Sequence, residues 1–136
     1  MFKPPTWEII PGARKTLPGA IAALGTRDET TYLLIGTSPA TGSLDSDLKA
    51  SDNKLHEMFD NYRALGDKRT TIAGENAIER KFRGSVETRE WSGVVVLLER
   101  KKQTYTILGM TYANSDLVQI QENVIHRVIS SMQFNP

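Results

Sequence analysis

The sequence predicts an α+β fold, in which two main helices pack on a curved antiparallel sheet of about six to seven strands. Three observations predict it. Most of the chain consists of short β-prone runs separated by Pro, Gly or charged turns. Two segments, residues 44–65 and 117–132, have apolar side chains at helical spacing. The connections in the second half are tight, which is typical of strands that are antiparallel neighbours.

The size and composition of the chain limit its architecture and its chemistry. A chain of 136 residues has the size of one domain, so we expect residues 1–136 to form a single domain. The absence of cysteine excludes disulfides, thiolate catalysis and thiolate zinc sites. The 17 basic and 16 acidic residues give a formal net charge of +1, which provides no broad field for attracting nucleic acid. We therefore expect no nucleic-acid partner.

The apolar runs are too short for a membrane-spanning helix. The longest, residues 94–98, has the length of a strand, whereas a span needs roughly 18 to 20 residues. We therefore expect no integral membrane segment. The opening MFKPPTWEII has prolines where a signal peptide needs apolar residues. Either the protein is cytoplasmic, or the chain is trimmed from a longer one, in which case we favour the periplasm or the cell envelope.

The first half begins with short strands. Residues 6–10 are β-prone, and the apolar runs 20–24 and 30–35 are expected to form a hairpin. The polar residues 25–29 would connect the two arms of this hairpin. Residues 37–42, TSPATG, contain Pro and Gly and are expected to break the strand pattern.

Residues 44–65 are predicted to form the first helix, because their apolar side chains fall on one face at about 100° per residue. Ser43 is suited to cap its start, and Gly66 to end it in the left-handed conformation. An alternative is a shorter helix that Ser51 caps. Both interpretations make residues 53–65 helical.

The second half reads as a series of antiparallel strands. Gly74 marks one turn, and the charged residues 100–103 mark another. The run VVVLL is apolar on both faces, so its strand is expected to lie centrally in the sheet. The expected strands are residues 69–73, 76–86, 90–99 and 104–113.

A second helix is expected to close the chain. Asn114 or Ser115 is suited to cap it. Its apolar side chains cover nearly half of the circumference, so this helix must pack on a sheet. These side chains are Leu117, Ile120, Val124, Ile125, Val128, Ile129 and Met132.

The second half and both ends of the chain show a familiar order of features. A short strand ends at Gly74 in TTIAGENAIERKF, and long strands follow in WSGVVVLLERKKQTYTILGMTYA. Pro4, Pro5 and Trp7 open the chain, and its last helix ends in VISSMQF, with Ile129, Ser130, Ser131, Met132 and Phe134. In this pattern the chain resembles the PsbP-like fold group, which includes PsbP and the DcrB-like bacterial domains. Residues 25–42 match nothing in that group.

The resemblance implies an antiparallel sheet flanked by helices, in a protein that works by binding rather than by catalysis. Bacterial members of the group commonly lie in the cell envelope or are joined to larger proteins. For this chain the resemblance therefore implies a protein partner and a place in the envelope.

The stretch HEMFD, residues 56–60, differs by one residue from the helical HExxH motif of zinc proteases. Such a site needs two nitrogen donors on one helix face and a third ligand. Here Asp60 replaces the second histidine, and the other histidine in the chain, His126, belongs to the closing helix. We therefore interpret His56, Glu57 and Asp60 as a solvated helix face, and His126 as the edge of an apolar face. No metal site is expected.

Motifs for catalysis or nucleotide binding are absent. The chain contains no G-x-S-x-G, no G-x-G-x-x-G and no P-loop, so we expect neither an enzyme nor a cofactor. Asp45 and Asp47, with Ser43, could ligate calcium weakly, but the capping of a helix start explains these residues better.

One candidate interaction surface remains. Trp91 and Tyr105 would form a recognition surface if both pointed outward on one face of the sheet; core packing is the alternative. The basic turn at Arg100, Lys101 and Lys102 could add charge to it, although charged turns also protect sheet edges from aggregation.

The sequence thus predicts a non-catalytic binding or scaffolding domain, part of a larger bacterial envelope-associated protein. The alternative is a small-molecule or metal-binding module with its site between the sheet and residues 25–42.

Overall fold

The computed structural model describes residues 7–9, 20–26, 31–40, 42–114 and 118–130, with side chains from residue 31 onward. The strands form one antiparallel sheet with the order β1-β2-β3-β7-β6-β5-β4. They are β1 (Trp7–Ile9), β2 (Ala20–Thr26), β3 (Thr31–Pro39), β4 (Asp60–Ile72), β5 (Glu75–Val86), β6 (Arg89–Arg100) and β7 (Gln103–Tyr112).

The α+β class, the open antiparallel sheet and the two helices agree with the prediction. The predicted count of about six to seven strands is more than the five strands, β3 to β7, whose side chains are described. β1 and β2 continue this set beyond β3 through backbone pairing.

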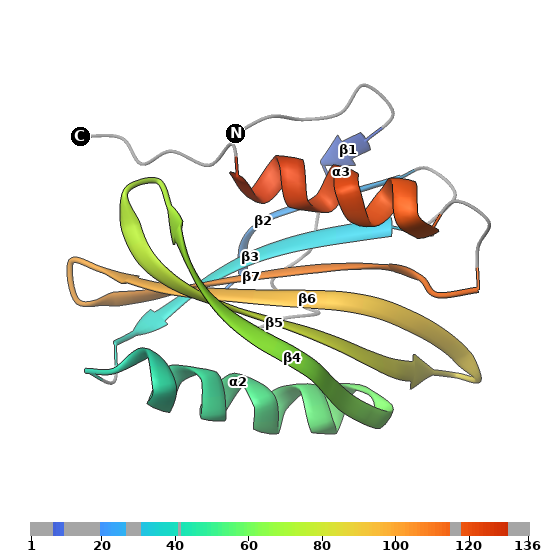
Figure 1. Ribbon diagram of the computed structural model, residues 1–136, viewed down its shortest axis with the longest axis horizontal. Helices are drawn as coiled ribbons and strands as arrows, with labels where there is room; N and C mark the ends of the chain where they lie inside the picture. Colours follow the sequence, from blue (N-terminus) through green and yellow to red (C-terminus); the bar gives the residue numbers. More distant parts are fainter. Residues whose placement is uncertain (1–6, 10–19, 27–30, 41, 115–117, 131–136) are drawn as a thin grey trace.

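The two helices lie on opposite faces of the sheet. Figure 1 shows α2 (Leu44–Met58) on one face and α3 (Val118–Ser130) on the other. Each face has its own hydrophobic core: Val95 and Leu97 of β6 pack on the α2 side, and Val96 and Leu98 pack on the α3 side. β6 lies between β5 and β7, and both of its faces are covered, as the VVVLL run predicted.

The hairpins of the second half close through two-residue turns. Lys101 and Lys102, between β6 and β7, have φ of 51° and 63°. Ala73 and Gly74, between β4 and β5, have φ of 52° and 81°. Turns with positive φ at both central residues match the right-handed twist of the strands, so the tight antiparallel connections agree with the prediction.

The first helix is shorter than predicted. Ser43 caps it as expected, because its hydroxyl group accepts a hydrogen bond of 3.1 Å from the backbone N–H of Ser46. The helix nevertheless ends at Met58, and residues 60–65 begin β4, so the prediction that residues 53–65 are helical was wrong, as was Gly66 as the end. Ser51 lies inside the helix, which excludes the alternative start.

The end of α2 is determined by tertiary contacts. Phe59 has extended backbone angles, and its buried side chain packs against Phe82 of β5. The extended chain then pairs with β5 from Asp60 to Ile72. This long ladder and the burial of Phe59 outweigh the helical spacing of the apolar residues, because propensity is a weak term beside packing.

Two further strands are longer than predicted. β3 continues to Pro39, which pairs with Gln103 and lacks the N–H that would extend the ladder, so the break expected from residue 37 comes later. β4 begins at Asp60 rather than at Arg69, because β5 is long enough to pair with it.

The closing helix lies over the sheet as predicted, with Ile125, Val128 and Ile129 buried. Ile120, which was expected on the apolar face, is 58% exposed. Asn114 lies in the turn after β7, whereas Ser115 and Met132 lie outside the described residues.

Candidate functional site

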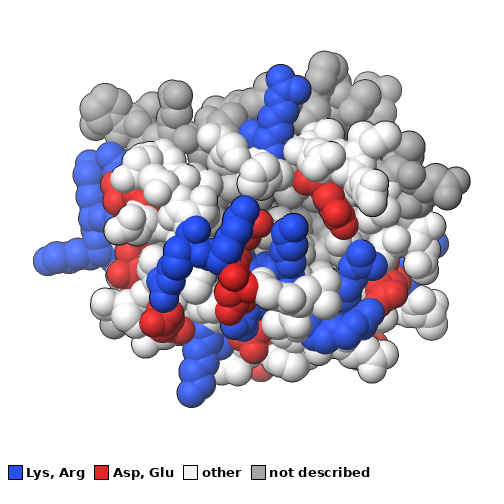
Figure 2. Space-filling model, in the orientation of Figure 1, with Lys and Arg blue, Asp and Glu red and all other residues white. Residues whose placement is uncertain are grey.

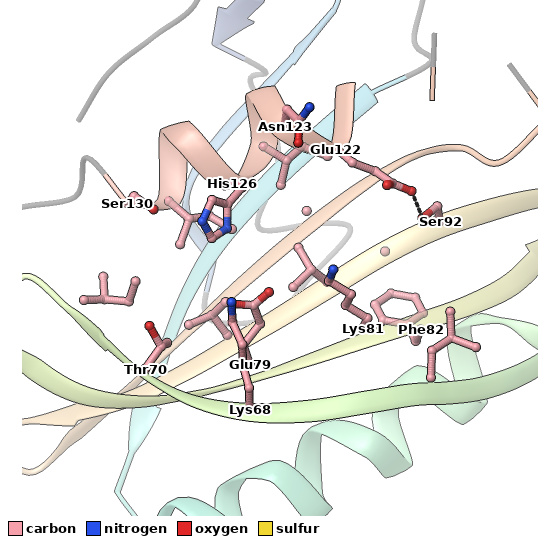
Figure 3. Close-up of a pocket in the computed structure, with 18 of the residues that line it drawn as sticks. Lys68, Thr70, Glu79, Lys81, Phe82, Ser92, Glu122, Asn123, His126 and Ser130 are labelled. Carbon is pink, nitrogen blue, oxygen red and sulfur yellow. Dashed lines mark hydrogen bonds and ion pairs between the residues drawn. The ribbon is translucent and has the colours of Figure 1, made fainter. Parts of the chain in front are cut away.

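A cleft of about 510 Å³ lies between α3 and the strands β4, β5 and β6. Figure 3 shows side chains from all of these elements pointing into it. Its volume is within the range of about 300–1,000 Å³ that is typical of small-molecule sites. The sequence prediction missed this cleft, because it placed a ligand site beside residues 25–42. β2 and β3 occupy most of that region, and the cleft lies elsewhere.

The cleft exists because α3 packs mainly on β7 and, among the described elements, no helix covers the strands beyond it on this face. Gly109 of β7 lets Ile125 approach the sheet closely, since a Cβ atom there would lie 2.4 Å from Ile125 Cγ2. On the same side of the sheet, the β4–β5 hairpin bends up toward α3 (Figure 1). The cleft is therefore the space between a closely docked helix and a twisted edge of the sheet.

The register of β5 and β6 pairs charged residues with apolar or small ones on the floor of the cleft. Glu79 lies opposite Val96, Lys81 lies opposite Val94, and Arg83 lies opposite Ser92. Because side chains alternate between the faces of a strand, these odd-numbered residues of β5 all face α3. The outer strand thus supplies charge, and the inner strand supplies mostly apolar surface.

The two carboxylates among the described residues of the cleft, Glu79 and Glu122, already have partners. Lys68 Nζ lies 3.9 Å from Glu79 Oε2, and Glu79 is only 6% exposed. At the other end, the Ser92 hydroxyl group donates a hydrogen bond of 2.6 Å to Glu122 Oε1, which links β6 to α3 (Figure 3). His126, one helical turn after Glu122, is exposed and also lines the cleft.

Two cations of the cleft lack such partners. Among the described residues, no hydrogen bond or ion pair joins the side chain of Lys81 or Arg83 to another group, and Arg83 Nε is buried without an acceptor. Figure 2 shows Lys and Arg side chains gathering below α3, over the β4 and β5 part of this face, with Asp and Glu among them. The cleft therefore has uncompensated positive charge beside its apolar wall.

The structure separates the residues of the predicted interaction surface. Trp91 is 8% exposed and packs on the α2 side, with its ring 5.7 Å from that of Tyr32. Tyr105 packs against the core on the α3 side. The prediction that Trp91 and Tyr105 could share one outward face was wrong, because an odd residue of β6 and an odd residue of β7 lie on opposite faces in this register.

The basic residues of that surface lie apart from Trp91. Lys101 and Lys102 are exposed in the β6–β7 turn. Arg100 Nε lies 3.7 Å from Glu75 Oε1, at the neighbouring end of β5. Their contribution to an interaction surface stays a prediction.

The HEMFD stretch is divided between two elements. His56 and Glu57 are exposed on α2, whereas Asp60 begins β4 and pairs with Ser85. His56 Nε2 lies 3.6 Å from Asp52 Oδ2, in the preceding turn of the helix. Among the residues that the structure describes, no group of three or more His, Asp or Glu side chains is placed to hold a metal ion.

Asp52 instead belongs to a network that joins α2 to β4 and β5. Arg80 donates hydrogen bonds to Asp67 Oδ1 at 2.6 Å and to Asp52 Oδ1 at 2.8 Å. The Tyr62 hydroxyl group donates to Asp52 Oδ1 at 2.5 Å. Burial and the Asp52 carboxylate raise the pKa of Tyr62, and Arg80 lowers the pKa of Asp67. These side chains are therefore engaged in holding α2 against the sheet.

Asp45 and Asp47 do not share a calcium site. Asp45 Oδ1 accepts a hydrogen bond of 2.8 Å from Arg69, on the surface. Asp47 is 4% exposed, and its Oδ2 accepts a hydrogen bond of 3.0 Å from the Thr104 hydroxyl group. A hydrogen bond with the Asp47 side chain, together with burial, raises the pKa of Glu99, at the end of β6.

We expect Glu99→Gln to raise the melting temperature at pH 7 by about 2–5 °C. Because the folded-state pKa of Glu99 is raised, this group makes its full contribution to the free energy of folding at pH values below its ordinary pKa. That contribution to stability is lost as the pH rises through the raised pKa. Glutamine mimics the protonated acid and should flatten that pH dependence. Thermal unfolding between pH 4 and 8 measures it, with the exposed Glu87→Gln as control. A lower melting temperature for Glu99→Gln at pH 7 would contradict the expectation.

Comparisons with known proteins point to a fold. No protein-family model matches the chain, and no curated protein matches it. Among solved structures, cyanobacterial PsbP (CyanoP) from Synechocystis sp. PCC 6803 matches with a TM-score of 0.68 and 13% identity, covering 95% of this chain and 82% of that chain. The chain has the PsbP-like fold.

Two other structures share the PsbP-like fold with this chain. A protein of unknown function from Pseudomonas aeruginosa has a TM-score of 0.65 and 14% identity, over 99% of this chain and 87% of that one. LpqN, involved in cell envelope biogenesis of Mycobacterium tuberculosis, has a TM-score of 0.62 and 10% identity, over 100% and 82%. The predicted resemblance to the PsbP-like fold group is thus confirmed at the level of fold. Within the described residues, no helix combines the length and apolar character needed to cross a bilayer.

One signal in the sequence could have revealed the cleft. Glu79, Lys81 and Arg83 place charges at every second position of a strand that is otherwise paired on both sides. Charge on an inward-facing row of a strand is costly when a helix covers that row. Such a row therefore indicates a face that is left partly open.

Proposed function

We propose that residues 1–136 act as one PsbP-like domain that binds a ligand without catalysing a reaction, and that the cleft between α3 and β4–β6 is its binding site. The supporting observation is that the cleft combines the volume of a small-molecule site with apolar side chains and cations that lack partners. This proposal favours the small-molecule alternative, with the site moved away from residues 25–42.

The polar groups of the cleft support binding rather than catalysis. Ser92 donates its hydrogen bond to Glu122, so its hydroxyl group is not oriented toward His126 as a nucleophile toward a base. Glu79 is paired with Lys68. No described pair in the cleft has the arrangement of a nucleophile and its base, and the proposal therefore includes no reaction step.

We further propose that the domain belongs to a larger bacterial envelope-associated protein, and that it interacts there with a protein partner in addition to its ligand. LpqN, whose fold is similar, is involved in cell envelope biogenesis, which supports this setting. Because Trp91 and Tyr105 lie on opposite faces, the partner surface has to be sought elsewhere, beginning with Lys101 and Lys102.

A ligand screen by NMR tests the binding site. In ¹H–¹⁵N spectra, ligands from a library of small molecules are expected to shift the amide signals of β5, β6 and α3. Val94→Phe places a bulky ring in the cleft and should weaken every such ligand by at least about tenfold, since the ring occupies their space.

The matched control is Val86→Phe, at an exposed position outside the cleft, which should leave affinity unchanged. Circular dichroism and melting curves verify that both variants fold. The proposal fails if no library member shifts these signals, or if Val94→Phe and Val86→Phe bind equally well. Chemical conversion of a bound ligand would contradict the non-catalytic part.

A further inference from the structure

We propose that the ligand of the cleft is a small amphiphile with one anionic head group on an apolar body, an inference that rests on the proposed function and specifies its ligand class. The head group would lie beside Lys81 and Arg83 on β5. The apolar body would lie against β6, in the space beside α3.

The apolar wall comes mainly from Val94 of β6 and from Leu65 of β4, which is 57% exposed. Val96, Ile125 and Ile129 also line the cleft, but they are at most 3% exposed and close it without offering much surface to a ligand. Val94 is only half-buried, so its surface is available to a ligand. Covering apolar surface that now faces water is favourable by about 25 cal/mol for each Å². This wall selects a ligand with an apolar part.

The opposite wall determines which charge the head group of the ligand carries. Among the described side chains that line the cleft, Lys68 pairs with Glu79, whereas Glu122 is hydrogen-bonded to Ser92 and keeps its negative charge. The three cations and two carboxylates of this set therefore give a formal net charge of +1. Lys81 and Arg83, next but one to each other on the same strand and on the same face, have no carboxylate partner within the described part of the chain. Two neighbouring cations without carboxylate partners favour an anion and repel a cation.

Arg83 adds a specific reason for an anionic acceptor. Its Nε is buried and has no hydrogen-bond partner among the described residues. A partly buried guanidinium without an acceptor is poorly solvated, and a carboxylate or phosphate oxygen against its terminal nitrogens supplies a charge-assisted hydrogen bond that offsets this cost. Lys81, which is exposed at the cleft, can contact the same head group.

The two walls also set the pose. Lys81 lies directly opposite Val94, so a cation and an apolar side chain are neighbours across the β5–β6 ladder. A ligand that lies across these strands can place its head group on β5 while its body contacts Val94. A carboxylate and a phosphate share this chemistry, and both are included in the test.

Isothermal titration calorimetry with four eight-carbon probes tests the ligand class. Octanoate and octyl phosphate represent the two anionic head groups, octanol lacks charge, and octylammonium has the opposite charge. We expect at least one anionic probe to bind at least about fivefold more tightly than octanol and octylammonium. Tighter binding of octanoate identifies a carboxylate site, and tighter binding of octyl phosphate identifies a phosphate site; each result supports the proposal.

Variants locate the head group. Lys81→Gln and Arg83→Gln are each expected to weaken the preferred anion by about fivefold or more and to leave octanol unchanged. Lys101→Gln, in the β6–β7 turn outside the cleft, is the matched control and should bind as the unmodified chain does. Melting curves confirm that each variant is folded.

The failures of the two proposals are distinguishable. If octanol or octylammonium binds as tightly as the anions and Val94→Phe abolishes that binding, the anionic class is overturned while the cleft remains the binding site. If the anions bind equally well to Lys81→Gln, to Arg83→Gln and to the unmodified chain, the placement of the head group is overturned. If none of the four probes binds while other library members shift the cleft signals, the amphiphile is overturned alone; if nothing shifts them, both proposals fall.

Discussion

Replacing Phe82 with alanine is expected to lower the free energy of unfolding by about 3–5 kcal/mol. Phe82 is fully buried, and its ring lies 5.3 Å from the ring of Phe59 and 5.5 Å from that of Tyr62. It thereby connects β5 to the end of α2 and the start of β4. Removing the ring leaves a cavity and loses contacts with both aromatic partners, since a packed core relaxes only partly.

Urea unfolding measured by circular dichroism determines this loss. Leu65→Ala is the control, because Leu65 is 57% exposed and its truncation should change stability by less than about 0.5 kcal/mol. A loss of under about 1 kcal/mol for Phe82→Ala would show that the α2-side core does not depend on this ring.

Replacing Gly109 with alanine is expected to destabilise the protein by about 1–3 kcal/mol through overpacking. The added Cβ atom would lie 2.4 Å from Ile125 Cγ2 and 3.5 Å from Val94 Cγ1. Contacts below about 3 Å cannot persist, so α3 has to move away from β7. Because Ile125 and Val94 also line the cleft, the same change should weaken ligand binding.

A double-mutant cycle verifies that the clash is the cause. Ile125→Ala removes the methyl group that the new Cβ atom would meet, so the double variant Gly109→Ala, Ile125→Ala should be more stable than the sum of the two single losses predicts, by about 1 kcal/mol. Unfolding in urea measures all three variants. Additive losses would mean that Gly109 contributes through backbone conformation instead of through space for α3.

The strands of the second half could be predicted from the sequence because their signals are local. The VVVLL run, the turn at Gly74 and the charged turn after Arg100 identified β5, β6 and β7 to within one residue at each end. Two-residue turns leave these strands few ways to pair other than as antiparallel neighbours. Their order in the sheet followed from that restriction.

The end of α2 could not be predicted in the same way. Tyr62 and Leu65 continue the helical spacing of apolar residues, yet both lie in β4. What competes with the helix is a ladder with β5, whose residues lie later in the chain. A local pattern has no information about such a partner, and the pairing wins because it also buries Phe59.

The candidate site shows the same division. The residue types of β5 were visible, with Glu79, Lys81 and Arg83 at alternate positions, but the element that closes the cleft opposite them is a helix about forty residues later. The predicted pair of Trp91 and Tyr105 failed for a related reason. Which face each residue occupies depends on the β6–β7 register, and a shift of one residue exchanges the faces.

The sequence by itself determined the α+β class, the cap at Ser43, the tight hairpins and the central place of the apolar strand, since short-range periodicity, turn residues and capping residues specify these features. Only the tertiary structure decided where α2 ends and which side chains form the cleft. The physical reason is that both depend on contacts between distant segments: the β4–β5 ladder extends the chain after Met58, and the close approach of Ile125 to Gly109 positions α3 beside Lys81 and Arg83.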